Sequence, residues 1–168
     1  DPMRDELFAA DDLPRTEQAV PTVLAVGTIE PRKNHLRLLR AFDSIVNKGL
    51  EARMVIVGRK GWMCDEVFAL LEKPSLKERV VWLGDAGDLA LQAMMRSCTI
   101  LAYPSLWEGF GLVFLEAMST GLPVLATRVS GVPEVIAHGE TGILVPPAEE
   151  GPLAEQMLAL AAAPERRL

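Results

Sequence analysis

The sequence predicts an α/β fold built on a doubly wound, parallel six-stranded sheet. Six short apolar segments alternate along the chain with segments whose apolar residues recur at helical spacing. Glycine-containing loops follow several of the apolar segments, and each connection includes a helix, as crossovers between parallel strands require. We expect the strand order 3-2-1-4-5-6, with a ligand crevice between strands 1 and 4.

The first half of the chain is expected to hold a linker, three strands and two helices. Residues 1–20 are polar and acidic with two prolines, which predicts an interdomain linker ahead of a domain at 21–168. Strands are expected in the apolar runs at 23–27, 53–58 and 80–84. Helices are expected at 35–48, with Asn34 as N-cap, and at 65–72, ended by Pro74.

The second half continues the same alternation. Asp88 is the expected N-cap of a helix that leads to a strand at 99–102. An apolar helix begins near Leu112 and stops at Gly121 and Pro123, a common helix-ending pair. A strand at 124–127, a short helix at 133–137, a strand at 143–145 and a helix at 152–163 complete the pattern.

Composition limits the classes of function. The 168 residues are 49% apolar, enough for one domain with a sizeable core. A net charge of −6 argues against a nucleic-acid surface, although a nucleotide needs only a local positive site. No apolar run reaches the roughly 18 residues of a membrane span. The chain opens at Asp1 without a basic and apolar leader, so we expect a fragment with no secretory signal.

The cysteines and histidines do not predict a metal site. Cys64 and Cys98 lack metal-ligand spacing, and Cys98 is expected as a core thiol in a reducing cytoplasm. His35 and His138 lie far apart in the sequence. We expect neither a metal nor a cofactor.

One stretch, residues 103–123, carries the strongest functional signal. It runs from the end of a strand through Gly109 and Gly111 into a helix, and glycines there let a ligand approach the backbone. The start of that helix suits a phosphate. Glu108 in the loop and Glu116 one turn into the helix are expected to point at one pocket.

The loop after the first strand is expected to face Glu108 across the crevice. It contains Arg32, whose planar guanidinium can bind phosphate by two hydrogen bonds, and Lys33, a compact charge. Lys60 and Arg59, after the second strand, are candidates to help them. Cations and a helix start can together neutralise a diphosphate leaving group without a metal.

The stretch 103–123 resembles the retaining glycosyltransferases of the class with two Rossmann-like domains (GT-B). Glu108 and Glu116 stand in a Pro-Ser-x-x-Glu-Gly-Phe-Gly-Leu and Leu-Glu-Ala-Met-x-x-Gly-x-Pro-Val setting. It is similar to the group 1 (family 4) proteins, which include sucrose synthases, glycogen synthases and bacterial mannosyltransferases. The resemblance covers about residues 23–147 and implies the C-terminal, donor-binding half.

The resemblance also implies roles for individual residues. In the family, Gly-Arg after the first strand is followed by Lys-Gly, and both cations hold the pyrophosphate. Gly27 and Lys33 match that pattern, whereas Thr28 stands where the arginine is expected, so Arg32 is a candidate substitute. We assign catalytic roles to Glu108, Lys33 and Arg32, with Glu108 bonding the transferred sugar. The expected nucleotide-sugar-binding residues are Gly27, Thr28, Lys60, Ala86, Asp88, Phe110, Gly111, Leu112 and Glu116.

These residues predict a domain that binds a GDP- or UDP-linked sugar in an enzyme that transfers a hexose such as mannose to a polysaccharide or glycolipid. The expected partners are the donor and an N-terminal acceptor-binding domain absent from the chain, with no nucleic acid and no membrane span. The fragment alone is expected to be inactive. We expect a cytoplasmic protein, peripheral to the inner membrane face at full length.

Two further functions remain open at this point. A sugar-nucleotide 2-epimerase would need similar carboxylates and a diphosphate clamp. A non-catalytic nucleotide-binding or receiver module is the second, but receivers need acidic residues after the first strand, where Arg32 and Lys33 stand. An NAD-binding domain is disfavoured because this loop lacks G-x-G-x-x-G. The tryptophans, Trp62, Trp82 and Trp107, are expected mainly in packing or at the pocket rim.

Overall fold

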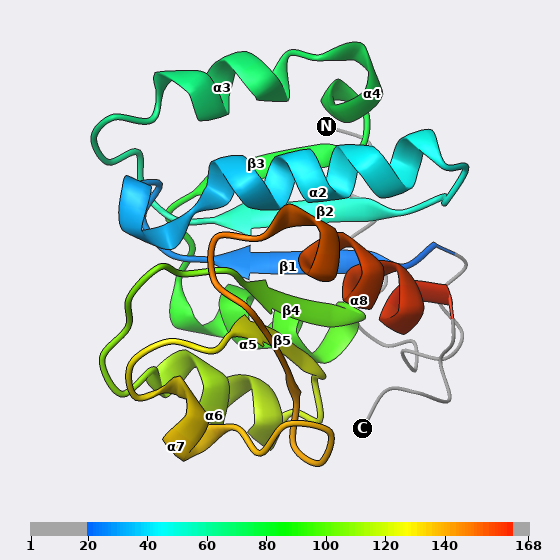
Figure 1. Cartoon of the computed structure of the whole chain (residues 1–168). Coiled ribbons are helices and arrows are strands. Elements are labelled where there is room, and N and C mark those ends of the chain that lie inside the picture. The colour runs from blue at the N-terminus through cyan, green and yellow to red at the C-terminus, as the bar shows by residue number, and fades with distance from the viewer. Residues whose placement is uncertain (1–19, 163–168) are drawn as a thin grey trace.

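The computed structural model describes residues 20–162 and confirms the predicted α/β architecture. A parallel six-stranded sheet has the order β3-β2-β1-β4-β5-β6, as expected (Figure 1). Its strands are β1 (Thr22–Val26), β2 (Arg53–Val57), β3 (Val80–Gly84), β4 (Ile100–Tyr103), β5 (Val124–Thr127) and β6 (Ile143–Val145). The predicted linker at 1–20 lies almost wholly outside the described residues.

Helices cover both faces of the sheet. They are α2 (His35–Asn47), α3 (Asp65–Leu71), α4 (Pro74–Lys77), α5 (Asp88–Ser97), α6 (Leu112–Ser119), α7 (Val132–Val135) and α8 (Glu150–Ala162), with the 3₁₀ turn η2 (Pro31–Lys33). In Figure 1, α2 and α8 lie in front of the sheet and α5 lies behind it. Each face therefore has its own apolar layer.

Alternation along β1 shows how the two layers form. Val23 and Ala25 are buried with α2, α3, α4 and α8, whereas Leu24 is buried with residues of α5, α6 and α7. Successive side chains of a strand point to opposite faces, so an uninterrupted apolar run serves a strand that is covered twice. This is why the central strands read as continuous apolar segments.

β1 lies at the centre of the sheet, next to the strand whose loop carries Glu108. This strand pairs with β2 on one side and with β4 on the other, and Val23 lies opposite both Met54 and Ile100. The chain order reverses between β1 and β4, so the helices that follow these two strands, α2 and α6, pack on opposite faces of the sheet. The loops after β1 and β2 also pass very close, because a Cβ added to Gly58 would lie 1.9 Å from the Gly27 carbonyl oxygen.

One of the two helix caps expected from the sequence is confirmed in position, and the other is wrong by one residue. Asn34 does occupy the N-cap position of α2, but it makes no side-chain capping bond, and its side chain contacts another loop instead. Asp88 is the first residue of α5, and Gly87 holds the N-cap position. In the part of the chain that is described, no helix combines the length and apolarity needed to cross a membrane.

Candidate functional site

The site is built where the loop after β1 meets the loop after β4. Asn34 Nδ2 donates to the Pro104 carbonyl oxygen at 3.1 Å, and the Leu106 amide donates to the Arg32 carbonyl oxygen at 2.8 Å. Residues about 70 positions apart in sequence are thus tied together by hydrogen bonds to the main chain. The loops form one platform at the carboxyl ends of the two central strands.

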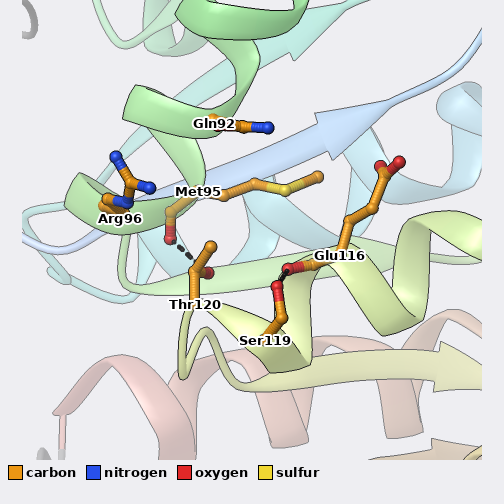
Figure 2. A pocket seen from close by; sticks show the side chains of 6 residues that line it. All are labelled: Gln92, Met95, Arg96, Glu116, Ser119 and Thr120. Carbon is orange, nitrogen blue, oxygen red and sulfur yellow. Dashed lines mark hydrogen bonds between the residues drawn. The ribbon is translucent and has the colours of Figure 1, made fainter.

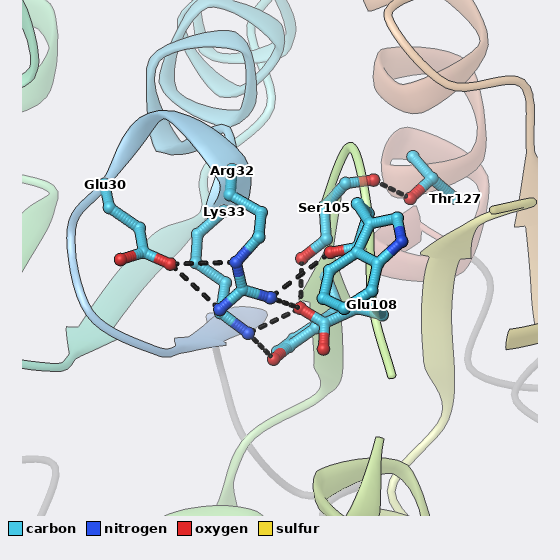
Figure 3. A network of polar contacts seen from close by, with 8 residues as sticks. Glu30, Arg32, Lys33, Ser105, Glu108 and Thr127 are labelled. Carbon is cyan, nitrogen blue, oxygen red and sulfur yellow. Dashed lines mark hydrogen bonds and ion pairs between the residues drawn. The ribbon is translucent and has the colours of Figure 1, made fainter. Parts of the chain in front are cut away.

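Glu108 is the centre of this platform. The carboxylate is 8% exposed, and its Oε1 accepts hydrogen bonds from Lys33 Nζ at 2.5 Å, Arg32 Nη1 at 3.0 Å and Ser105 Oγ at 2.9 Å (Figure 3). Ser105 is itself fixed, because its carbonyl oxygen accepts a hydrogen bond from the Thr127 hydroxyl of β5. These three bonds end on Oε1, which leaves Oε2 outside them. The structure therefore confirms the prediction that Lys33 and Arg32 lie next to Glu108.

Lys33 is held along its whole length. A Cβ on Gly27 would lie 3.2 Å from Lys33 Cε, so the methylene chain passes directly over this glycine. The ammonium donates to the Tyr103 hydroxyl as well as to Glu108, and it lies 4.6 Å from the centre of the Tyr103 ring. Tyr103 in turn meets Phe114 of α6 edge-on, with ring centres 5.0 Å apart. Packing thus fixes the position of the charge.

Two buried groups beside Lys33 have shifted pKa values. Burial, and then the charge of Lys33, lower the pKa of His35 from 6.5 to about 4, so this imidazole is neutral at pH 7. Its Nδ1 is buried and has no hydrogen-bond partner among the described residues. Burial, followed by the charge of Glu108 and a hydrogen bond to it, raises the pKa of Tyr103, so the phenol keeps its proton.

The glycine loop leads into α6 as the sequence predicted. Gly111 is the N-cap of α6 in the left-handed region at φ 69°, and a Cβ there would lie 2.4 Å from the Phe114 ring. Any other residue would be strained at this position and would displace Phe114. Phe110 and Leu112, on either side, are 62% and 66% exposed.

Glu116 lies apart from the Glu108 cluster. It is exposed on α6, and among the described residues its carboxylate has no hydrogen bond or ion pair. Its side chain lines a hollow of about 200 Å³ between α5 and α6, which Gln92 and Arg96 also line (Figure 2). Glu108 does not line this hollow, so the structure does not bring the two carboxylates together in one pocket as expected.

The other predicted binding residues surround the cluster without joining it. Thr28 is half-buried, with its methyl group beside Gly61. Lys60 Nζ lies 4.9 Å from the Phe68 ring centre, and Arg59 pairs with Asp85 at 3.1 Å. Ala86 is half-buried against the apolar layer of α5 and α6, and Asp88 is exposed. None of these side chains contacts Glu108 within residues 20–162.

The three tryptophans, which the sequence predicts in packing or at the pocket rim, differ in their exposure. Trp62 is 61% exposed and Trp107 is 59% exposed, whereas Trp82 is packed edge-on against Phe68 at 4.7 Å. Other large apolar side chains that follow the carboxyl ends of β2, β3 and β4, in loops or at the starts of α5 and α6, are also exposed: Met63, Leu89, Leu106, Phe110 and Leu112. We call these five residues with Trp62 and Trp107 the apolar rim.

Sequence reasoning missed Glu30, Tyr103, Ser105 and His35 as site residues. Glu30 had a local signal, because a carboxylate two positions before Arg32 can pair with it, and it does so at 2.9 Å. Tyr103 and Ser105 lie within the stretch that was singled out, but their partners come from distant segments. Nothing in the sequence marks His35 as buried beyond its place at a helix start.

Fold and site together define a doubly wound α/β domain with a charged side-chain cluster at the β1–β4 switch point. A model of the family glycosyl transferases group 1 matches residues 12–168, so the chain belongs to this glycosyltransferase family and the expected resemblance is confirmed. It is 37% identical over 128 residues to O-antigen chain mannosyltransferase B of Escherichia coli, an alignment that covers 74% of this chain and 32% of that protein.

Two solved structures share the fold along almost the whole chain. Sucrose-phosphate synthase from Thermosynechococcus elongatus superposes with a TM-score of 0.81 at 28% identity, covering 97% of this chain and 41% of the synthase. Anabaena HepE, solved in complex with UDP and glucose, gives a TM-score of 0.80 at 26% identity and covers 98% and 43%. The chain therefore spans between about a third and two fifths of the length of these proteins.

Proposed function

We propose that this domain binds the nucleotide-sugar donor of a retaining glycosyltransferase that adds a hexose such as mannose to a polysaccharide or glycolipid. The observation that carries the proposal is the cluster in which Lys33 and Arg32 share one oxygen of the nearly buried Glu108. Membership of the group 1 family and a mannosyltransferase relative support the same reading. No observation favours a 2-epimerase or a non-catalytic module.

The geometry suits the separation of a nucleoside diphosphate from a sugar. Lys33 and Arg32 are positioned to neutralise the negative charge that develops on the leaving diphosphate, with the start of α6 beside them. Glu108 Oε2, outside the Oε1 contacts, is proposed to accept a hydrogen bond from a sugar hydroxyl. Glu116 is proposed to bind the ribose diol, and Phe110, Gly111 and Leu112 to contribute main-chain contacts.

We further propose that a second, acceptor-binding domain completes the enzyme. The chain spans 32% of the length of the mannosyltransferase relative. The apolar rim follows the carboxyl ends of β2, β3 and β4, and exposed large apolar side chains are typical of a surface that another domain or ligand covers. GDP- and UDP-linked donors both remain candidates, with HepE as a relative solved with UDP. Action at the inner membrane face belongs to the same proposal.

Calorimetric titration of the chain with UDP and with GDP tests the proposal. We expect a dissociation constant in the millimolar range or below for at least one of them, and loss of about tenfold or more in affinity with Lys33→Met, since a charge-assisted phosphate contact is removed. Lys48→Met removes an exposed lysine just after the last turn of α2 and serves as the matched control. Equal affinities for the two variants, or no binding by the wild-type chain at millimolar ligand, would contradict the proposal.

A further inference from the structure

Glu30 is a nearly buried carboxylate next to the diphosphate cations, and the proposed reaction assigns it no role. It is 8% exposed and lies in extended backbone, φ −145°, just before the η2 turn. Its Oε1 accepts a hydrogen bond from Arg32 Nε at 3.0 Å and lies 2.9 Å from Arg32 Nη2 (Figure 3). One carboxylate oxygen thus holds two of the three guanidinium nitrogens.

The third nitrogen of Arg32 is directed at the site. Nη1 donates to Glu108 Oε1 at 3.0 Å and to the Trp107 carbonyl oxygen at 3.3 Å, and the guanidinium carbon lies 5.8 Å from the centre of the Trp107 ring. The Arg32 side chain is 37% exposed, so its position depends on these polar contacts more than on packing. A free arginine side chain would lose rotamer entropy on binding a ligand, which weakens binding.

We propose that Glu30 is a positioning residue, which holds the Arg32 guanidinium at the diphosphate site before the donor arrives. This inference rests on the proposed function. When a diphosphate draws Nη1 from Glu108, the contacts of Nε and Nη2 with Glu30 still hold the group. The pair then does in this chain what an arginine at the position of Thr28 is expected to do in the family, while the Thr28 side chain lies beside Gly61 and outside the cluster.

Electrostatics and positioning predict opposite effects of removing Glu30, which makes the inference testable. A carboxylate beside a phosphate-binding cation repels the diphosphate, so its loss by Coulomb's law alone would tighten binding. If Glu30 acts by holding Arg32, its loss weakens binding, because the ordering of the guanidinium then has to occur when the ligand binds. The direction of the change separates the two accounts.

The experiment measures UDP and GDP affinity of the chain by calorimetry for Glu30→Ala and Glu30→Gln. We expect Glu30→Ala to weaken binding about tenfold. We expect Glu30→Gln to stay within about threefold of wild type, since the amide oxygen still accepts from Nε and Nη2. Glu66→Ala, which removes a carboxylate 3.8 Å from Arg40 in an exposed pair, is the control and should bind as wild type does. Unchanged or tighter binding by Glu30→Ala overturns the inference.

Repeating the Glu30 substitution in a variant that lacks Arg32 shows whether Glu30 acts through Arg32. In Arg32→Ala, adding Glu30→Ala should cause no further loss of affinity, since residues that act as one unit are not additive. An equal loss in both backgrounds overturns the inference. If Glu30→Ala does not fold, Glu30→Asp, which withdraws the carboxylate by one methylene, should still weaken binding, and unchanged affinity overturns it. Failure of wild type to bind rejects the proposed function and this inference together, whereas binding insensitive to Glu30 rejects the inference alone.

Discussion

Glu108 and Glu116 stand in one sequence motif but in opposite physical environments. Glu108 is nearly buried and shares one oxygen among a lysine, an arginine and a serine. Glu116, on the outer side of α6, is exposed and lines the hollow between α5 and α6. One motif can therefore contain a carboxylate that bonds to other residues of the protein and a carboxylate that is free to bond to a ligand.

This difference decides how substitutions at the two positions are interpreted. A change at Glu108 disturbs the contact between the β1 and β4 loops, so lost activity there has a structural component. A change at Glu116 removes no hydrogen bond or ion pair of the described residues.

The largest expected effect is on folding stability. Glu108→Leu leaves Lys33 and Arg32 close together without their shared counter-charge, and breaking such a nearly buried pair costs about 3–5 kcal/mol. Glu116→Leu should change the free energy of unfolding by no more than about 0.5 kcal/mol. Urea denaturation of both variants measures the difference, and equal losses would show that the two environments are alike.

A pH effect on stability is expected on the Glu108 side, where His35 is buried beside Lys33. The folded pKa of His35, about 4, lies below its usual 6.5, so between these values the unfolded chain binds a proton that the folded chain does not. The free energy of unfolding should thus fall by about 3 kcal/mol as pH drops from 6.5 to 4. His35→Gln should lack this part of the loss in urea denaturation at pH 7, 5.5 and 4, and parallel profiles would refute the assignment.

Glu116 should matter for ligand and not for stability. We expect Glu116→Gln to weaken UDP or GDP binding about tenfold, the cost of one charge-assisted pair of hydrogen bonds, with an unchanged urea midpoint. Glu155→Gln, an exposed glutamate on α8, is the matched control. Wild-type affinity in calorimetry for Glu116→Gln would mean that this carboxylate does not contact the nucleotide.

The smallest expected effect concerns the phenol that accepts a hydrogen bond from Lys33. Tyr103→Phe keeps the ring that meets Phe114 but removes the hydroxyl, at a cost of about 1 kcal/mol in unfolding free energy. The shift of the urea midpoint measures it. An unchanged midpoint would indicate that Glu108, without Tyr103, is enough to hold the lysine.

The fold was predictable because it depends on the spacing of apolar residues within short segments of the sequence. Alternation of apolar strands with helices gave six strands and their order, and the strand ends placed Lys33 and Glu108 at one edge. What failed depends on contacts between distant segments. Asn34 holds the predicted N-cap position, but its side chain donates to the Pro104 carbonyl oxygen and makes no capping bond to α2. The exposure of Trp107 likewise depends on what surrounds the loop in space, which no local pattern contains.

The site was predictable to the level of the motif and not to that of the supporting residues. Glu108, Lys33 and Arg32 were found from loop position and charge. Glu30 was not found, since its burial follows from the course of the η2 turn. Tyr103 was counted as a strand residue, because its hydroxyl acquires a role only when Lys33 folds over Gly27.

The hydrogen bonds between the β1 and β4 loops have a consequence for protein engineering. Asn34 binds the Pro104 carbonyl, and the Leu106 amide binds the Arg32 carbonyl, so each loop supplies part of the shape of the other. A chimera that takes residues 27–34 from a relative while keeping residues 104–108 would combine two loops that do not fit each other's hydrogen bonds. Transplanting both segments at once is the exchange that should preserve the crevice.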